Sequence, residues 1–138
     1  MNFVNCLLAA IQGRNQGVES ATKRPKTGKV AMKKIISFQG EPGAYSHQAC
    51  NEVFPGETAL PCHSFEGAIA AVNEGRADYA MLPVENSTYG RVADIHSLLP
   101  ESGLHIIGEH FVRVHANLLG HKGASVDEIT IAQSHPVL

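Results

Sequence analysis

Two short polar stretches, each directly after an apolar run, contain the residues of this sequence best suited to bind a small anion. The first is Gly40 to Ser46, a Gly/Pro turn before a segment of helical spacing, and the second is Glu85-Asn86-Ser87. A helix that begins at such a turn points unpaired backbone N–H groups outward, where they can bind a carboxylate. The amide of Asn86 can both donate and accept a hydrogen bond. Together these groups predict a site for a small carboxylate.

The individual groups in these stretches would have different roles. Around Gly43, Ala44 and Tyr45 the candidate groups are backbone N–H donors, and Ser46 adds a hydroxyl. Glu85 is a general-acid candidate by residue type, because partial burial raises the pKa of a carboxyl. The residues alone leave two plainer interpretations open. The first stretch can be an ordinary turn between a strand and a helix, and the second a capped turn.

Composition and charge narrow the class of protein. The 138 residues are 43% hydrophobic and 17% charged, which suits one ordinary globular core. Residues 1–32 carry a net charge of +4 and residues 33–138 one of −6, and the sequence has no Trp. An acidic body without a basic stripe argues against nucleic acid as the main partner. The cysteines lack C-x-x-C spacing and the histidines lack H-x-x-x-H spacing, which predicts no disulfide framework and no metal site and fits a cytoplasmic protein.

Residues 1–32 are interpreted as a disordered or mis-assigned N-terminal extension. Phe3 to Ile11 is apolar, but it has no positive charge ahead of it and is too short to span a bilayer. We therefore expect neither a signal peptide nor a membrane helix. Gln12 to Lys29 is polar and basic without periodicity, which is typical of a tail. Met32 directly precedes the first expected strand and is an alternative start.

From Lys33 onward, apolar runs alternate with segments of helical spacing. The expected strands are Ile35–Phe38, Thr58–Cys62, Ala77–Val84, His105–Val114 and Ile129–Ala132. The expected helices are Ser46–Phe54, a helix capped by Ser64 that ends before Gly75, Gly90–Leu99 with Pro100 and Gly103 as terminators, and a short helix opened by the capping box Ser125 to Glu128. Such alternation predicts an α/β fold with parallel strands and helices on both faces. Ligands in these folds bind at the carboxyl ends of the strands, and Ser134 follows the last expected strand.

Three motifs in this order resemble those of the prephenate dehydratase family. Gly40 to Ser46 is similar to the family's G-x-x-G-[ST]-[FY]-[ST] loop, with Ala44 in place of the usual hydroxyl residue. Pro83 to Gly90 is similar to its P-[VI]-E-N-[ST]-x-x-G motif, and Ser134-His135-Pro136 to its S-H-P motif. Each motif alone is weak evidence, but three ordered matches at family-like spacing are strong evidence.

The resemblance covers residues 33–138 and implies a two-lobed fold like that of the type II periplasmic binding proteins. Parallel-rich sheets would carry helices on both faces, and the substrate would lie between the lobes. Residues 33–112 would form most of the first lobe, and residues 113–138 the start of a second lobe that is incomplete in this sequence. The resemblance also implies a homodimer for the full-length protein.

The activity implied by the resemblance is that of a lyase of phenylalanine biosynthesis. Prephenate loses carbon dioxide and water together and becomes phenylpyruvate, a reaction that needs no cofactor. The family pattern implies Asn86 and Ser134 as catalytic residues. It implies substrate binding by Gly43, Ala44, Tyr45, Ser46, Glu85, Asn86, Ser87 and Ser134. Glu85 then becomes a structural hydrogen-bond partner, because the family's proton donor is assigned to the threonine of a Thr-Arg-Phe motif, and His135 is interpreted as fixing a turn.

No Thr-Arg-Phe motif occurs among the 138 residues, so we expect this chain to be inactive by itself. The same absence motivates two alternatives. One is a non-catalytic module that uses the same scaffold to bind a carboxylate metabolite as a sensor. The other is a truncated chain without a function of its own. Tight binding of a ligand without turnover would favour the sensor.

Overall fold

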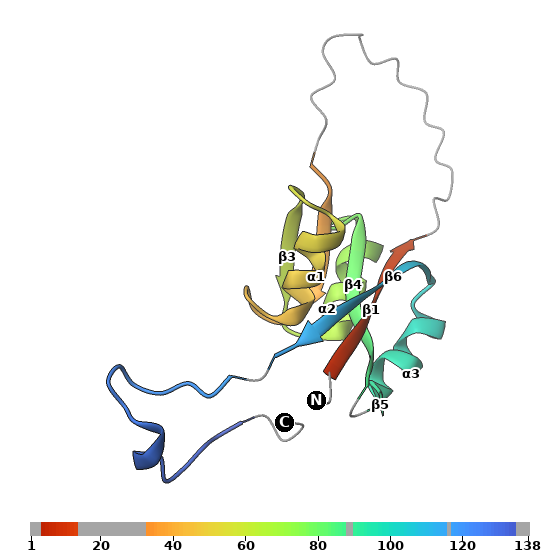
Figure 1. Cartoon of the computed structure of the whole chain (residues 1–138). Helices are drawn as coiled ribbons and strands as arrows, with labels where there is room; N and C mark the ends of the chain where they lie inside the picture. Colours follow the sequence, from red (N-terminus) through yellow and green to blue (C-terminus); the bar gives the residue numbers. More distant parts are fainter. Residues whose placement is uncertain (1–3, 14–32, 88–89, 116, 135–138) are drawn as a thin grey trace, which may run out of the picture.

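The computed structural model describes residues 33–87, 90–115 and 117–134, together with the backbone of residues 4–13. In this part of the chain, one six-stranded sheet is covered by three helices (Figure 1). The strands are β1 (Val4–Gly13), β2 (Ile35–Gln39), β3 (Thr58–Cys62), β4 (Tyr79–Asn86), β5 (Gly90–Arg91) and β6 (Leu104–Val114). The helices are α1 (Tyr45–Val53), α2 (Phe65–Asn73) and α3 (Ala93–Glu101), and a 3₁₀ turn, η1, spans Val126–Glu128.

Three neighbouring strands of the sheet, β3, β2 and β4, run parallel to one another. The strand order is β3-β2-β4-β1-β6, and β5 pairs with the end of β4. β2 pairs in parallel with both β3 and β4, so that Ile36 lies between Ala59 and Tyr79. The strands expected in this region are confirmed. Because all three run in the same direction, their carboxyl ends lie at one edge of the sheet.

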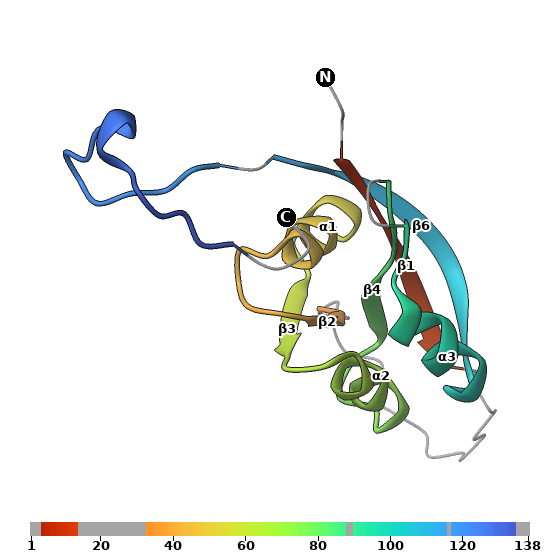
Figure 2. The same ribbon diagram turned by 90° about the horizontal axis from the view of Figure 1, so that it is seen from below.

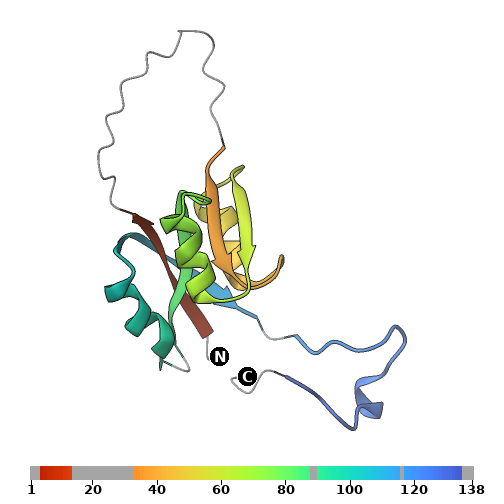
Figure 3. The same ribbon diagram turned by 180° about the vertical axis from the view of Figure 1, so that it is seen from behind.

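Helices cover both faces of the sheet, as the alternation of elements predicts (Figure 2). On one face, Phe38 and Met81 are buried in a cluster that includes residues of α1. The other face is covered by α2 and α3 (Figure 3), where Leu82 belongs to one buried cluster with Ile69 of α2 and Ile95 of α3. The α/β class of the fold is therefore confirmed.

The third helix differs from its expected bounds. It begins after Arg91 because Gly90 and Arg91 pair with the end of β4 as strand β5. Pro100 lies inside its last turn and does not end it, while Gly103, at a φ of +72°, turns the chain into β6. None of the helices in the described ranges is long and apolar enough to cross a membrane.

Within residues 1–32, interpreted from the sequence as a disordered or mis-assigned extension, Val4–Gly13 form β1. This strand runs antiparallel between β4 and β6, and its residue Ala9 pairs with Leu82 on one side and Glu109 on the other. The segment is ordered because its backbone groups find partners on two neighbouring strands. The sheet is therefore mixed and not wholly parallel. The rest of that extension, with its alternative start, lies outside the described residues.

After β6 the chain leaves the sheet as an arm, residues 117–134, in which the structure shows no strand. The capping box is confirmed, because Ser125 N donates to Glu128 Oε2 (3.4 Å) and Ser125 Oγ accepts from Asp127 N (3.4 Å). It opens only the short 3₁₀ turn η1. The expected strand Ile129–Ala132 is wrong, since a strand needs a neighbouring edge for its backbone groups and the arm extends away from the sheet (Figure 1).

Candidate functional site

Two of the three polar stretches lie at the carboxyl edge of the parallel strands. The loop Gly40–Ala44 follows β2, and Gly40 N donates to Cys62 O at the end of β3 (2.9 Å). Glu85 and Asn86 lie at the end of β4, which pairs with β2 near its own start and then continues alongside β1. The order of elements predicts this shared edge, where ligands of such sheets bind.

The loop before α1, residues 40–44, needs glycine at two positions. Gly40 has a φ of +117° and Gly43 a φ of +99°, values that residues with a side chain rarely adopt. Ala44 N donates to Glu41 O (3.0 Å) and closes the turn. Ala44 is also the N-cap of α1 and has no side-chain oxygen to cap it. The hydroxyl residue that the family pattern usually has here could make that cap.

A histidine that sequence reasoning missed holds this loop. Gly43 N donates to Nδ1 of His47 (3.0 Å), and the imidazole stacks on the ring of Phe38 with centroids 5.3 Å apart. Nδ1 is therefore the acceptor of a backbone hydrogen bond in this contact. The signal in the sequence was the spacing, because a residue in the first turn of a helix can reach back to the loop before it.

Some of the backbone N–H groups of the loop therefore already have hydrogen-bond acceptors within the protein. The N–H groups of Gly43 and Ala44 are bonded within the loop and to α1. The N–H groups of Tyr45 and Ser46 belong to the first turn of α1, where the helix provides no carbonyl partner. The Ser46 residue is only 7% exposed, so most of it faces the interior.

The hydroxyl of Tyr45 is not directed at a free surface. It donates to His115 O (2.9 Å) and accepts from His115 N (3.0 Å), just after the end of β6. Sequence reasoning placed Tyr45 in the binding loop but gave its hydroxyl no partner. No local pattern predicts a contact between residues 70 positions apart.

The second stretch is held by strand pairing. Asn86 is half-buried, and its position in β4 pairs with Cys6 of β1 and Gly90 of β5. Glu85 is exposed and lies opposite Arg91 across the β4–β5 pair. The general-acid interpretation required a partly buried carboxyl, so the exposed Glu85 does not fit it.

The third stretch is described only at Ser134, which is exposed at the end of the arm. His135 and Pro136 lie outside the described residues, and so do Thr88 and Tyr89 of the second motif. The approach of Ser134 to Asn86 stays a prediction.

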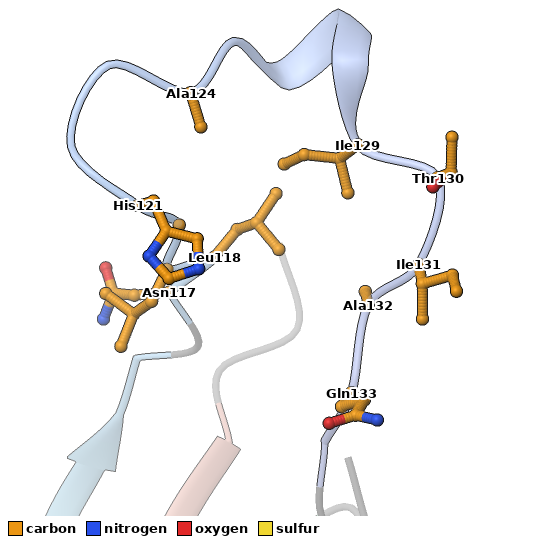
Figure 4. A pocket seen from close by; sticks show the side chains of 11 residues that line it. Asn117, Leu118, His121, Ala124, Ile129, Thr130, Ile131, Ala132 and Gln133 are labelled. Carbon is orange, nitrogen blue, oxygen red and sulfur yellow. The ribbon is translucent and has the colours of Figure 1, made fainter.

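A hollow within the arm is a separate feature (Figure 4). Leu118 on one limb points toward Ile129 on the other, and His121 is the titratable side chain among the lining residues. The hollow belongs to the arm and not to the edge of the parallel strands, so it is not part of the candidate site. Among the described residues, no cluster of three or more His, Cys, Asp or Glu side chains could hold a metal ion.

The sequence and the structure have relatives among known proteins. A family model described as prephenate dehydratase matches residues 36–138. A bifunctional N-acyl-homoserine lactone acylase/prephenate dehydratase from Komagataeibacter europaeus is 56% identical over 104 residues, which are 75% of this chain and 37% of that protein. Chloroplastic arogenate dehydratase 5 from Arabidopsis thaliana is 44% identical over 101 residues, 73% of this chain and 24% of that protein.

A solved structure described as GqqA, a novel type of quorum quenching acylases, is 64% identical with a TM-score of 0.54. The similarity covers 59% of this chain and 42% of that chain. The chain thus spans less than half the length of each of these relatives.

Proposed function

Because the chain belongs to the prephenate dehydratase family, we propose that its carboxyl-edge site binds prephenate and that the whole protein converts prephenate to phenylpyruvate in phenylalanine biosynthesis. The match of residues 36–138 to the family carries this proposal. The geometry supports it, because two of the three motifs lie at the edge where such sheets bind ligands.

Conversion of prephenate to phenylpyruvate requires that the protein position the substrate and supply one proton. The bond to the departing carboxylate breaks, its electron pair enters the ring, and the hydroxyl leaves as water once it is protonated. Aromatisation of the ring supplies the driving force within the substrate. The protein must hold the carboxylates, orient the ring and deliver the proton.

Each predicted site residue has a role in this proposal. The N–H groups of Tyr45 and Ser46 bind one carboxylate at the start of α1. The amide of Asn86 donates to a substrate oxygen from the end of β4, and Ser134 contributes a hydroxyl from the arm. The remaining residues support these groups: Gly43 and Ala44 shape the turn, and Glu85 and Ser87 flank Asn86.

The test consists of a binding measurement and a turnover measurement. Calorimetric titration of the 138-residue chain with prephenate measures binding, and assay of the natural gene product for phenylpyruvate measures turnover. We expect binding by the chain, turnover by the natural gene product, and no turnover by the 138-residue chain alone. A natural gene product that makes no phenylpyruvate from prephenate would contradict the proposal. Arogenate, tested in parallel, decides between the two substrates that the relatives' names mention.

The sensor alternative is separated by the same experiment. Binding of prephenate, phenylpyruvate or phenylalanine by the natural gene product without any turnover would support a carboxylate sensor. Phenylpyruvate formation excludes it.

A second activity is favoured by one observation. The relative at 56% identity and the solved structure at 64% identity are both named as acylases. We therefore also propose hydrolysis of the amide bond of N-acyl-homoserine lactones, in which the N–H groups that open α1 bind the oxyanion of the attacked carbonyl. Release of homoserine lactone amine from an N-acyl substrate, measured with an amine-reactive dye, tests it. No release by the natural gene product would exclude it.

Location and assembly belong to the same proposal. We infer a cytoplasmic protein, supported by the free thiols of Cys50 and Cys62. We also infer a homodimer, supported by three exposed apolar side chains on β6, which are Ile106 (57%), Ile107 (49%) and Phe111 (60%). Sedimentation of the natural gene product measures its mass, and a monomer at micromolar concentration would contradict the dimer.

A further inference from the structure

The hydroxyl of Tyr45 binds both polar backbone groups of one distant residue. Its oxygen accepts from His115 N at 3.0 Å and it donates to His115 O at 2.9 Å. Two bonds to the same residue fix both the position and the orientation of that piece of backbone. We call this pair of bonds the Tyr45 clamp.

The clamp joins two functionally distinct parts of the chain. Tyr45 is the first residue of α1, and its N–H group is one of the two proposed carboxylate donors. His115 is the first residue after β6, where the chain leaves the sheet to form the arm that carries Ser134 (Figure 1). The same residue therefore contacts the proposed ligand position through its backbone and the exit of the arm through its side chain.

A second contact and shared packing support the placement of α1 along β6. Near the other end of the helix, Glu52 Oε2 lies 2.6 Å from His110 Nε2 of β6. Val112 of β6 is buried in the cluster that α1 covers. The Glu52 contact is exposed and its partner lies within β6. The clamp acts at the exit of the arm itself and is made by uncharged groups.

We propose that Tyr45 is a positioning residue that couples ligand binding at the loop before α1 to the direction in which the arm leaves β6. The coupling rests on the proposed function, because its ligand is prephenate. A carboxylate on the Tyr45 N–H group orders the start of α1 and so favours the clamped arrangement. By linkage, the factor by which the ligand favours the clamped arrangement equals the factor by which loss of the clamp weakens ligand binding.

The experiment compares two tyrosine-to-phenylalanine variants of the chain. Tyr45→Phe keeps the ring and removes both bonds to His115. Tyr79→Phe is the matched control, because it loses one hydrogen bond, from Lys34 Nζ (2.8 Å), at the opposite end of the strands. Amide hydrogen exchange at His115 and calorimetric titration with prephenate are measured on both.

We expect about tenfold faster exchange of the His115 amide in Tyr45→Phe and none of this change in Tyr79→Phe. Prephenate should bind Tyr45→Phe about fivefold more weakly, and it should slow the exchange of His115 only in the chain that keeps the clamp. Equal exchange in Tyr45→Phe and the unsubstituted chain would overturn the clamp. Faster exchange with unchanged affinity would overturn the coupling.

Two other outcomes, no binding of prephenate and failure of Tyr45→Phe to fold, also have a defined interpretation. If the unsubstituted chain binds no prephenate, the coupling fails together with the proposed function, while the exchange at His115 still decides the clamp. If Tyr45→Phe does not fold, His115→Pro serves instead, because proline removes the N–H donor and leaves Tyr45 intact. An unchanged prephenate affinity of His115→Pro would overturn the coupling.

Discussion

At the scale of single residues, the loop before α1 shows that the N–H donors of a binding motif can be hydrogen-bonded by groups of the protein itself. The glycines and the turn were predictable, because only a few residue types adopt the backbone that such a turn requires. The bond from Gly43 to His47 was not predicted, and neither was the clamp on His115. Motif matching identifies which residues form the loop, but the side-chain partners depend on how the helix and β6 pack around it.

Asn86 gives the most direct test of the proposed site. Asn86→Asp keeps the shape of the side chain but replaces an amide donor with a negative charge, which repels a dianionic substrate. We expect prephenate to bind more weakly by about 1.5–3 kcal/mol, the usual value of a hydrogen bond to a charged group. Calorimetric titration measures the change.

The matched control is Asn73→Asp, which adds the same charge on the exposed end of α2, away from the carboxyl edge. It should leave the affinity for prephenate unchanged. Equal weakening by both substitutions would show that net charge and not the position of Asn86 is responsible.

Cys50 provides a prediction about pH. Burial raises the pKa of its thiol from 9.0 to about 12. Between these values the unfolded chain loses the proton and the folded chain keeps it, so the free energy of unfolding falls as the pH rises above about 9. We expect Cys50→Ala to be less stable at pH 7 but to lose this part of the decline between pH 8.5 and pH 10.5, a range chosen to bracket ordinary thiol titration. Urea denaturation at both pH values measures it, and parallel declines in the two proteins would contradict the assignment.

At the scale of elements, the sequence predicted best where local signals and packing agree. α2 combines a serine cap, an apolar face and a glycine stop, and its expected bounds were nearly those observed. Ile129–Ala132 has the apolar residues of a strand but no neighbouring edge in the described chain, and no strand forms. Local patterns indicate what a segment prefers, and pairing with other segments decides what it becomes.

The two serine caps allow a matched test of this point. Ser64 Oγ accepts from Gly67 N (3.1 Å) at the start of α2, which packs on the sheet. Ser125 makes a similar cap on η1, which buries nothing. We expect Ser64→Ala to lower the free energy of unfolding by about 1 kcal/mol and Ser125→Ala by less than about 0.5 kcal/mol. Equal losses, measured by urea denaturation, would mean that the arm is as tightly packed as the sheet.

At the scale of the whole molecule, the decisive element is one that the sequence did not identify. β1 lies between β4 and β6 and so joins the parallel strands to the strand from which the arm departs. Its apolar run is interpreted as part of an extension because it is short and a polar, basic stretch without periodicity follows it. Its strand partners are far away in the sequence. Long-range antiparallel pairing of this kind leaves no local pattern to detect.

A proline substitution measures how much the sheet depends on β1. Ala9 pairs with Leu82 of β4 and Glu109 of β6, so Ala9→Pro removes a backbone donor in the interior of the sheet. We expect a loss of at least about 1–3 kcal/mol in the free energy of unfolding, the cost of leaving a buried polar group without its partner. Ala124→Pro is the control, because it also removes one donor, whose bond to His121 O (2.9 Å) lies in the exposed arm. That substitution should change the free energy of unfolding by less than about 0.5 kcal/mol.

Exposed strand edges also invite self-association, so Ala9→Pro should sediment as larger species at high concentration. If the two proline variants unfold at the same urea concentration and both sediment like the unsubstituted chain, β1 does not belong to the sheet in solution.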